Sequence, residues 1–78
     1  MSNKGWINIG NMIEKEFVFK DFVEAIGFIV KAGLLAEKAD HHPELWNSYN
    51  KVKVQLTTHS SGGLTEKDFD LALKIEQI

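Results

Sequence analysis

Apolar and polar residues alternate along two short stretches near the start of the chain, as expected for strands with one buried face. The first stretch covers residues 6–9 and the second covers residues 12–19. Gly10-Asn11 lies between them and is a turn signal. The pattern therefore predicts a β-hairpin, although Lys15 interrupts its apolar face without an explanation from the sequence.

The hydrophobic period changes to that of a helix after Asp21, which is a predicted N-cap. We expect this helix to end near Ala39, because Pro43 disfavours helical backbone just before it. Gly27 and Gly33 lower helix stability, and they would be tolerated if another backbone packs closely there. The apolar positions that recur at helical spacing are Phe22, Ala25, Ile26, Ile29 and Val30.

A second hairpin is predicted from two further alternating stretches, residues 45–49 and 52–58. Between them, Asn50-Lys51 is the predicted two-residue turn. This turn would place Leu45 opposite Leu56 across the strands. The alternation puts the apolar residues of the second strand on one face of the sheet and its polar residues on the other.

A last helix is predicted after the flexible loop formed by residues 60–63. Thr65 would cap it, and Asp68 stands at the spacing of a capping box. The element order is then ββαββα, in one domain over residues 1–78. We predict an α+β fold, with a four-stranded antiparallel sheet and two helices packed on one face. The other face is free to bind a second copy of the chain.

The small size of the chain limits how it can be stabilised. A chain of 78 residues buries only about 60% of its unfolded surface. Small folds add disulfides, a metal or self-association, and the absence of cysteine excludes disulfides. Self-association is therefore expected, with a metal as the weaker alternative. The absence of cysteine also fits a reducing compartment.

Charge and hydropathy exclude several classes of partner. The net charge is −2, from nine lysines and eleven acidic residues, and the sequence has no basic patch for nucleic acid. No apolar run reaches the length of a membrane span, and the N-terminus has no signal pattern. We expect a cytoplasmic protein that binds neither nucleic acid nor membrane.

Three histidines and an aspartate are the candidate catalytic residues: His41, His42, His59 and Asp68. The predicted hairpin brings His59 near the His-His pair, and Asp68 enters at the first turn of the last helix. Imidazole titrates near neutrality, so such a cluster suits general acid–base catalysis. Taken singly, each histidine is an ordinary surface residue, and Asp68 is a helix cap. Zinc bound by the histidines and the carboxylate is a second interpretation, although adjacent His-His side chains usually diverge.

Four segments resemble the pterin-4a-carbinolamine dehydratase family: residues 37–44, which include His-His-Pro-Glu, and residues 49–52, 58–59 and 63–68. The resemblance begins at Gly5-Trp6 and extends over nearly the whole chain. It implies a hydro-lyase that converts 4a-hydroxytetrahydropterins to quinonoid dihydropterins, without metal or cofactor, in the recycling of tetrahydrobiopterin. Relatives are dimers or tetramers, so the resemblance also implies a homodimer or homotetramer.

The resemblance assigns a role to each residue of the motif. His41 and His59 would be general acids toward opposite faces of the pterin, and His42 would bind the ring and act as base. Asp68 and Glu37 would orient the histidines or hold the substrate. The residues that would line the pocket are Pro43, Thr58, His59, Ser60 and Ser61.

Three functions remain open at this point. The first is dehydration of a pterin carbinolamine by histidine acid–base catalysis. The second is a non-catalytic oligomeric binding or regulatory module on the same scaffold. The third is a metal-dependent enzyme that uses the same histidines. Turnover with and without a chelator distinguishes all three.

Overall fold

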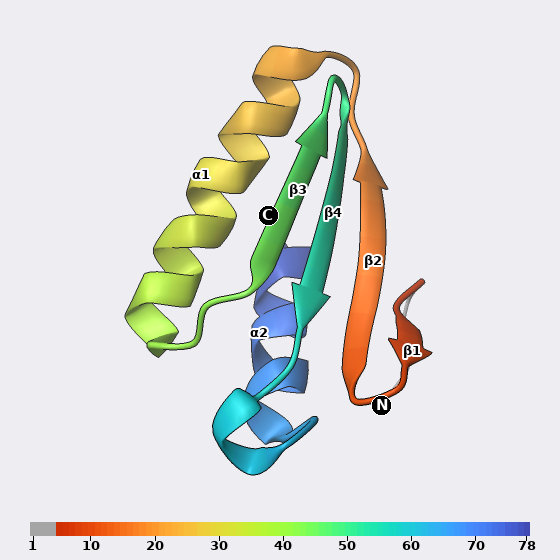
Figure 1. Cartoon of the computed structure of the whole chain (residues 1–78). Coiled ribbons are helices and arrows are strands. Elements are labelled where there is room, and N and C mark those ends of the chain that lie inside the picture. The colour runs from red at the N-terminus through yellow and green to blue at the C-terminus, as the bar shows by residue number, and fades with distance from the viewer. Residues whose placement is uncertain (1–4) are drawn as a thin grey trace.

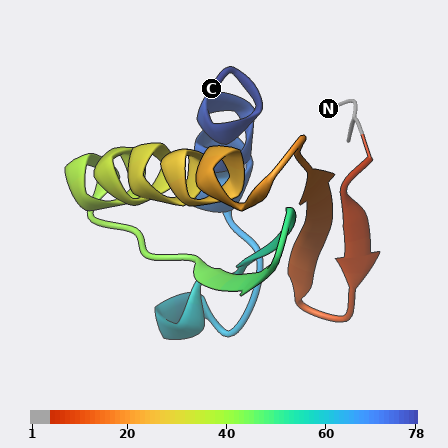
Figure 2. The ribbon, with the colours of Figure 1, turned by 90° about the horizontal axis from the view of Figure 1, so that it is seen from above.

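One antiparallel sheet and two helices make up the fold. The computed structural model describes the backbone of residues 5–78 and every side chain in that range except that of His59. The strands lie in the order β1-β2-β4-β3, and both helices lie on the same side of the sheet (Figure 1, Figure 2). The predicted ββαββα order and α+β class are confirmed. The elements are β1 (Ile7–Ile9), β2 (Met12–Val18), α1 (Phe22–Ala39), β3 (Glu44–Ser48), β4 (Lys51–Leu56), the 3₁₀ turn η1 (His59–Ser61) and α2 (Glu66–Glu76).

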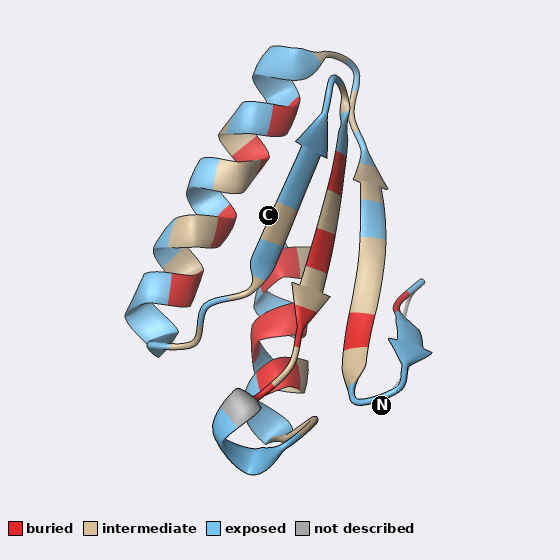
Figure 3. Cartoon of the chain, in the orientation of Figure 1, coloured by how far each residue is buried: buried red, intermediate tan, exposed pale blue. Residues whose placement is uncertain are grey.

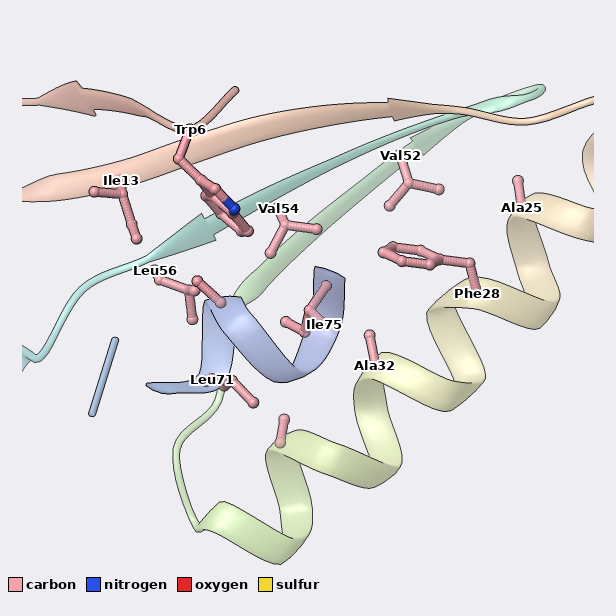
Figure 4. Packing of buried hydrophobic residues seen from close by; sticks show 12 residues of the cluster. Trp6, Ile13, Ala25, Phe28, Ala32, Val52, Val54, Leu56, Leu71 and Ile75 are labelled. Carbon is pink, nitrogen blue, oxygen red and sulfur yellow. The ribbon is translucent and has the colours of Figure 1, made fainter. Parts of the chain in front are cut away.

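The core lies between the sheet and the helices. Strand β4 alternates buried and partly exposed residues, as Figure 3 shows along its length. Val52, Val54 and Leu56 are fully buried and point toward the helices (Figure 4). Helix α2 covers them with Leu71 and Ile75, which are also buried. Each fully buried side chain of this kind contributes about 1.5–3 kcal/mol to folding.

Helix α1 packs on the sheet through a stripe that matches the predicted apolar positions only in part, since Ala25 is buried and Ile29 packs against the core. Phe22, Ile26 and Val30, which we expected to face inward, are 49%, 38% and 56% exposed. Apolar residues occur all around this helix, so its period alone does not identify the inner face. Small side chains on the inner face let the helix approach the sheet closely. The buried residues of α1 are Ala25, Phe28, Ala32 and Ala36.

The helical glycines are not explained by close packing within the described part of the chain. A Cβ atom placed on Gly27 or Gly33 would meet no atom within 4 Å, apart from immediate neighbours and the helix's own backbone. The close approach to the core is made by the alanines of the inner stripe instead. These glycines therefore lower the stability of α1 without a packing benefit inside the described part of the chain.

The second hairpin turns one residue earlier than predicted. Its turn is Tyr49-Asn50, and Leu45 pairs with Val54 rather than with Leu56. Tyr49 adopts a positive φ of 51°, and Asn50 is held in the turn by reciprocal backbone and side-chain hydrogen bonds to Phe19. The register shifts by two residues, so every side chain keeps its predicted face.

The structure explains the polar residue on the apolar face of β2. Lys15 forms an ion pair with Glu76 near the end of α2, and its ammonium lies 4.7 Å from the centre of the Phe17 ring. Trp6 is buried, and its indole N–H donates to the same carboxylate over 3.0 Å. These contacts link Trp6 and the end of α2 to strand β2.

The sheet face opposite the helices is open in the single chain. It carries Glu16, Lys53 and Trp46, and the Trp46 side chain is 55% exposed with the Lys53 ammonium 5.6 Å from its ring centre. Burial of this face against a second copy stays a prediction. Neither helix in the described range is long and apolar enough to span a bilayer.

Candidate active site

The end of α1 turns the chain sharply into the first histidine. Asp40 adopts a left-handed conformation with φ of 51°, and its backbone N–H donates to the last carbonyls of the helix. The His41 backbone N–H then donates to the carbonyl of Ala36 over 3.1 Å. This ending fixes where His41 leaves the helix, beside the start of α2.

Asp68 is held at the first turn of α2 by a capping box. The Thr65 side chain accepts from the start of the helix, and the Asp68 side chain accepts from the Thr65 backbone N–H over 2.9 Å. The capping role predicted from the Thr65 to Asp68 spacing is confirmed. Asp68 is completely buried, and a buried carboxylate requires several hydrogen bonds to offset its loss of water.

His41 and Asp68 form the central contact of the site. The Nε2 atom of His41 lies 2.5 Å from Oδ1 of Asp68, and the His41 side chain is only 11% exposed. The second carboxylate oxygen of Asp68 accepts from the Thr58 hydroxyl over 2.8 Å. Asp68 therefore caps the helix and orients the imidazole at once.

His42 is arranged quite differently. Its Nε2 atom lies 2.9 Å from the Glu37 carboxylate, and both side chains are well exposed, at 61% and 81%. An exposed pair of this kind contributes little to stability, because water screens it. His42 presents its ring to solvent at the edge of the site.

A cleft of about 300 Å³ brings four of the predicted residues together. His41, His42, Thr58 and Ser60 line it, with Asp40, Thr57 and Lys67. An adjoining hollow of about 320 Å³ is lined by Thr58, Ser60, Ser61, Thr65, Glu66 and Lys67. The cleft is lined mainly by polar groups, which suits a hydrogen-bonding heterocycle better than an apolar ligand.

The remaining predicted residues are placed less directly. Glu37 reaches the site through His42, and Ser61 lines only the adjoining hollow. Pro43 is half-buried and is not among the residues that line either space. His59 begins η1, but its side chain is outside the described residues, so its predicted role stays a prediction.

Sequence reasoning missed Lys67, which lines both the cleft and the adjoining hollow. The available signal was its position in the first turn of α2, directly before Asp68. Because Asp68 is buried at the first turn of α2, the preceding residue, Lys67, lies at the exposed edge of the cleft. Asp40 and Thr57 were also missed as lining residues, and the sequence carried no signal for either.

A larger hollow lies away from the histidines. It measures about 490 Å³ and lies between the C-terminal halves of the two helices. It is lined by lysines and apolar side chains and includes none of the predicted site residues. The residues that line it are Lys31, Leu34, Leu35, Lys38, Lys74, Gln77 and Ile78.

Metal binding was the second interpretation of the histidine cluster. Within residues 5–78, leaving aside the His59 side chain, no three His, Cys, Asp or Glu side chains are grouped so that they could hold a metal ion. Asp68 directs its two oxygens to His41 and to protein donors instead. The described side chains therefore offer hydrogen bonding and proton transfer.

The sequence matches one known protein family. The model of the pterin 4 alpha carbinolamine dehydratase family matches residues 1–78. The chain belongs to this family. The resemblance of the His-His-Pro-Glu segment and its companions is thus confirmed at the family level.

Relatives from bacteria and archaea share about half of the sequence or more. A protein of Picosynechococcus sp., named provisionally as a pterin-4-alpha-carbinolamine dehydratase, is 55% identical over 73 residues, which is 94% of this chain and 79% of that protein. A protein of Sulfurisphaera tokodaii with the same name is 51% identical over 75 residues, covering 96% and 81%. Membership of the dehydratase family therefore rests on the full length of the fold.

Solved structures agree with this assignment. A crystal structure described as a transcriptional coactivator/pterin dehydratase from Brucella melitensis has a TM-score of 0.89 and 48% identity, covering 94% of this chain and 80% of that one. A pterin dehydratase-like protein identified as a RuBisCO assembly factor in the alpha-carboxysome has a TM-score of 0.75 and 19% identity, covering 92% and 83%. The second similarity shows the shared fold alone.

Proposed function

We propose that this protein removes water from a 4a-hydroxytetrahydropterin to give a quinonoid dihydropterin, by histidine acid–base catalysis without a metal or cofactor. The observation that carries the proposal is the pairing of a nearly buried imidazole, His41, with a fully buried carboxylate, Asp68, at the wall of a polar cleft. Family membership supplies the substrate class. Recycling of tetrahydrobiopterin is the process that this reaction would serve.

The protein has only proton transfers to supply in this reaction. An acid protonates the departing hydroxyl, the carbon–oxygen bond breaks, and the lone pair of the ring nitrogen forms the new C=N bond. A base removes the proton of a ring N–H, so that water and the quinonoid product result. The nitrogen lone pair makes this step easy, and each positioned acid or base contributes about 10²–10⁴-fold.

The residues of the cleft suit these tasks. His41 is proposed as the acid, since Asp68 holds its ring and lies close enough to stabilise the imidazolium. His42, exposed at the edge, is proposed to bind the pterin and act as base. His59 is proposed as a second acid from the family motif. Glu37 would orient His42, and Pro43, Thr58, Ser60 and Ser61 would shape the pocket.

The alternative is a non-catalytic binding or regulatory module on the same scaffold. One relative of the fold is described as a RuBisCO assembly factor. The His41–Asp68 pair favours catalysis, because a scaffold gains little from burying a carboxylate against an imidazole when apolar residues would pack there.

Turnover separates these functions. Purified protein would be mixed with freshly generated 4a-hydroxytetrahydropterin, and the quinonoid product would be followed by its absorbance, with and without chelator. Turnover above the uncatalysed rate that survives the chelator supports the proposal. Turnover lost on chelation would assign a metal-dependent enzyme, and no turnover at all would leave the binding module.

We further propose that the protein is a homodimer or homotetramer in the cytoplasm. The outer face of α1 supports self-association, because Val23, Val30 and Leu34 are 78%, 56% and 67% exposed. Zero cysteine content supports a reducing compartment. Sedimentation velocity at micromolar concentration tests the assembly, and a single species near the chain mass of 8.8 kDa would contradict it.

A further inference from the structure

The side chain of Thr58 is buried behind the cleft and makes its hydrogen bonds there. Its hydroxyl oxygen lies 2.8 Å from Oδ2 of Asp68 and 2.9 Å from the Thr65 hydroxyl. Thr58 is only 6% exposed, and its backbone is held by reciprocal hydrogen bonds with Gly63 across the loop. The residue is thus fixed in place, and its hydroxyl serves the protein interior.

The hydrogen bonds of this network have one consistent direction. An ionised carboxylate only accepts, so the single proton of the Thr58 hydroxyl is donated to Asp68. The Thr65 hydroxyl must then donate to Thr58, and its own oxygen accepts from the Lys67 backbone N–H over 3.3 Å. Each group therefore donates to the next: the Lys67 backbone N–H to the Thr65 hydroxyl, that hydroxyl to Thr58, and Thr58 to the Asp68 carboxylate.

This direction determines what each carboxylate oxygen of Asp68 can do. Oδ2 accepts from two protein donors, the Thr58 hydroxyl and the Thr65 backbone N–H. Oδ1 remains for His41, whose Nε2 lies 2.5 Å away. Since Oδ1 can only accept, Nε2 carries a hydrogen. The other ring nitrogen, Nδ1, makes no hydrogen bond to any described residue.

We propose that Thr58 is a positioning residue for His41. Its hydroxyl orients Asp68, which holds His41 with hydrogen on Nε2 and leaves Nδ1 as the nitrogen that gives and takes the proton. The use of Nδ1 in the reaction rests on the proposed function. The hydrogen on Nε2 is a property of the free protein and is measurable without substrate.

Three variants test the proposal. Thr58→Val keeps the shape and removes the hydroxyl, whereas Thr58→Ser keeps the hydroxyl. Ile75→Val shortens a fully buried side chain elsewhere on α2, so it lowers stability without touching the network. Protein with ¹⁵N-labelled histidine would be studied by NMR across pH, with His41 assigned by comparison with His41→Gln.

The tautomer of His41 gives the first readout. We expect the wild type, Thr58→Ser and Ile75→Val to show hydrogen on Nε2, and Thr58→Val to show a mixture of both tautomers. A wild-type spectrum in which the neutral imidazole of His41 carries its hydrogen on Nδ1 rather than on Nε2 overturns the proposal, even where Thr58→Val does not fold. An unchanged His41 tautomer in folded Thr58→Val overturns it equally.

Turnover gives the second readout and separates the two proposals. Thr58→Val should lower kcat/KM by roughly ten- to hundredfold and change its pH profile, as for the loss of a hydrogen bond to a charged group. Thr58→Ser should stay within about threefold of the wild type, and Ile75→Val should keep the wild-type profile. If the wild type shows no turnover while the tautomer shifts in Thr58→Val, the proposed function fails and the positioning role stands.

Discussion

The Nε2 atom of His41 lies 2.5 Å from Oδ1 of Asp68, although 27 positions separate the two residues. One residue follows the end of α1 and the other lies in the first turn of α2. The sheet and the two helices therefore bring this imidazole and carboxylate together, because no single segment of the chain contains both. The same carboxylate caps α2, so the proposed catalysis and the start of this helix depend on one side chain.

Asp68→Asn should lower both activity and stability. The amide has one acceptor oxygen in place of two. Its NH2 group would therefore face either the His41 N–H or the Thr58 and Thr65 donors, and that hydrogen bond would be lost. We expect kcat/KM to fall by about 10²-fold or more. The free energy of unfolding should fall by about 1–3 kcal/mol. Steady-state kinetics and thermal denaturation measure the two effects.

The matched control for this change is Asp70→Asn, two residues further along α2. Asp70 is exposed, so the same chemical change should leave activity and stability close to the wild type. Equal losses in both variants would show that charge on α2, rather than the pairing with His41, is responsible.

His42→Ala should weaken substrate binding as well as the rate. His42 lines the cleft and is exposed, so its removal costs contacts with the ligand but little folding energy. We expect KM to rise and kcat to fall, with a circular dichroism spectrum like that of the wild type. Glu37→Gln, which alters only the exposed partner, should give a smaller effect. Unchanged KM and kcat in His42→Ala would refute the role proposed for this residue.

Lys67→Ala should raise KM more than it lowers kcat. The Lys67 side chain lines the cleft and the adjoining hollow, where its ammonium group can donate a hydrogen bond to a pterin carbonyl. Loss of one hydrogen bond from a charged donor corresponds to roughly a tenfold rise in KM. Lys74→Ala removes the same charge from the other end of α2, beside the larger hollow. The prediction fails if both variants raise KM equally.

Gly33→Ala should stabilise the protein. A Cβ at this position meets nothing within 4 Å, and alanine is favoured over glycine in a helix by about 0.8–1.0 kcal/mol. For a domain of this size the melting temperature should rise by about 4–8 °C per kcal/mol. Differential scanning calorimetry measures the shift.

The contrasting variant is Gly62→Ala, which should lower the melting temperature. Gly62 has a positive φ of 72°, a conformation that is strained for residues with a side chain, although its surroundings are open.

A lower melting temperature for Gly33→Ala, together with a smaller species in sedimentation, would contradict the prediction and would instead place Gly33 in contact with a second copy.

Local signals predicted the elements and part of the site. Alternation identified the strands, and the Thr65 to Asp68 spacing identified the capping box that the structure contains. Leu45 was assigned to the correct face despite the wrong partner, because a register shift of two residues preserves the alternation. The fold class followed from the order of these elements.

Local signals were insufficient where packing made the choice. Helix α1 is apolar around most of its circumference, so only packing in the fold selected Phe28 and Ala32 over Ile26 and Val30 as buried residues. Lys15 gained its explanation from Glu76, which is 61 positions away. The cleft position of Lys67 likewise depends on how α2 sits beside the end of α1.

The sequence by itself determined the order of the strands and helices and the presence of three histidines and a capping aspartate, since periodicity, turns and caps act over a few residues. The tertiary structure alone decided which imidazole meets the buried carboxylate and that the Thr58 hydroxyl lies behind it. The physical reason is that hydrogen bonds form over about 3 Å, and residues distant in the sequence reach that separation only when the core packs.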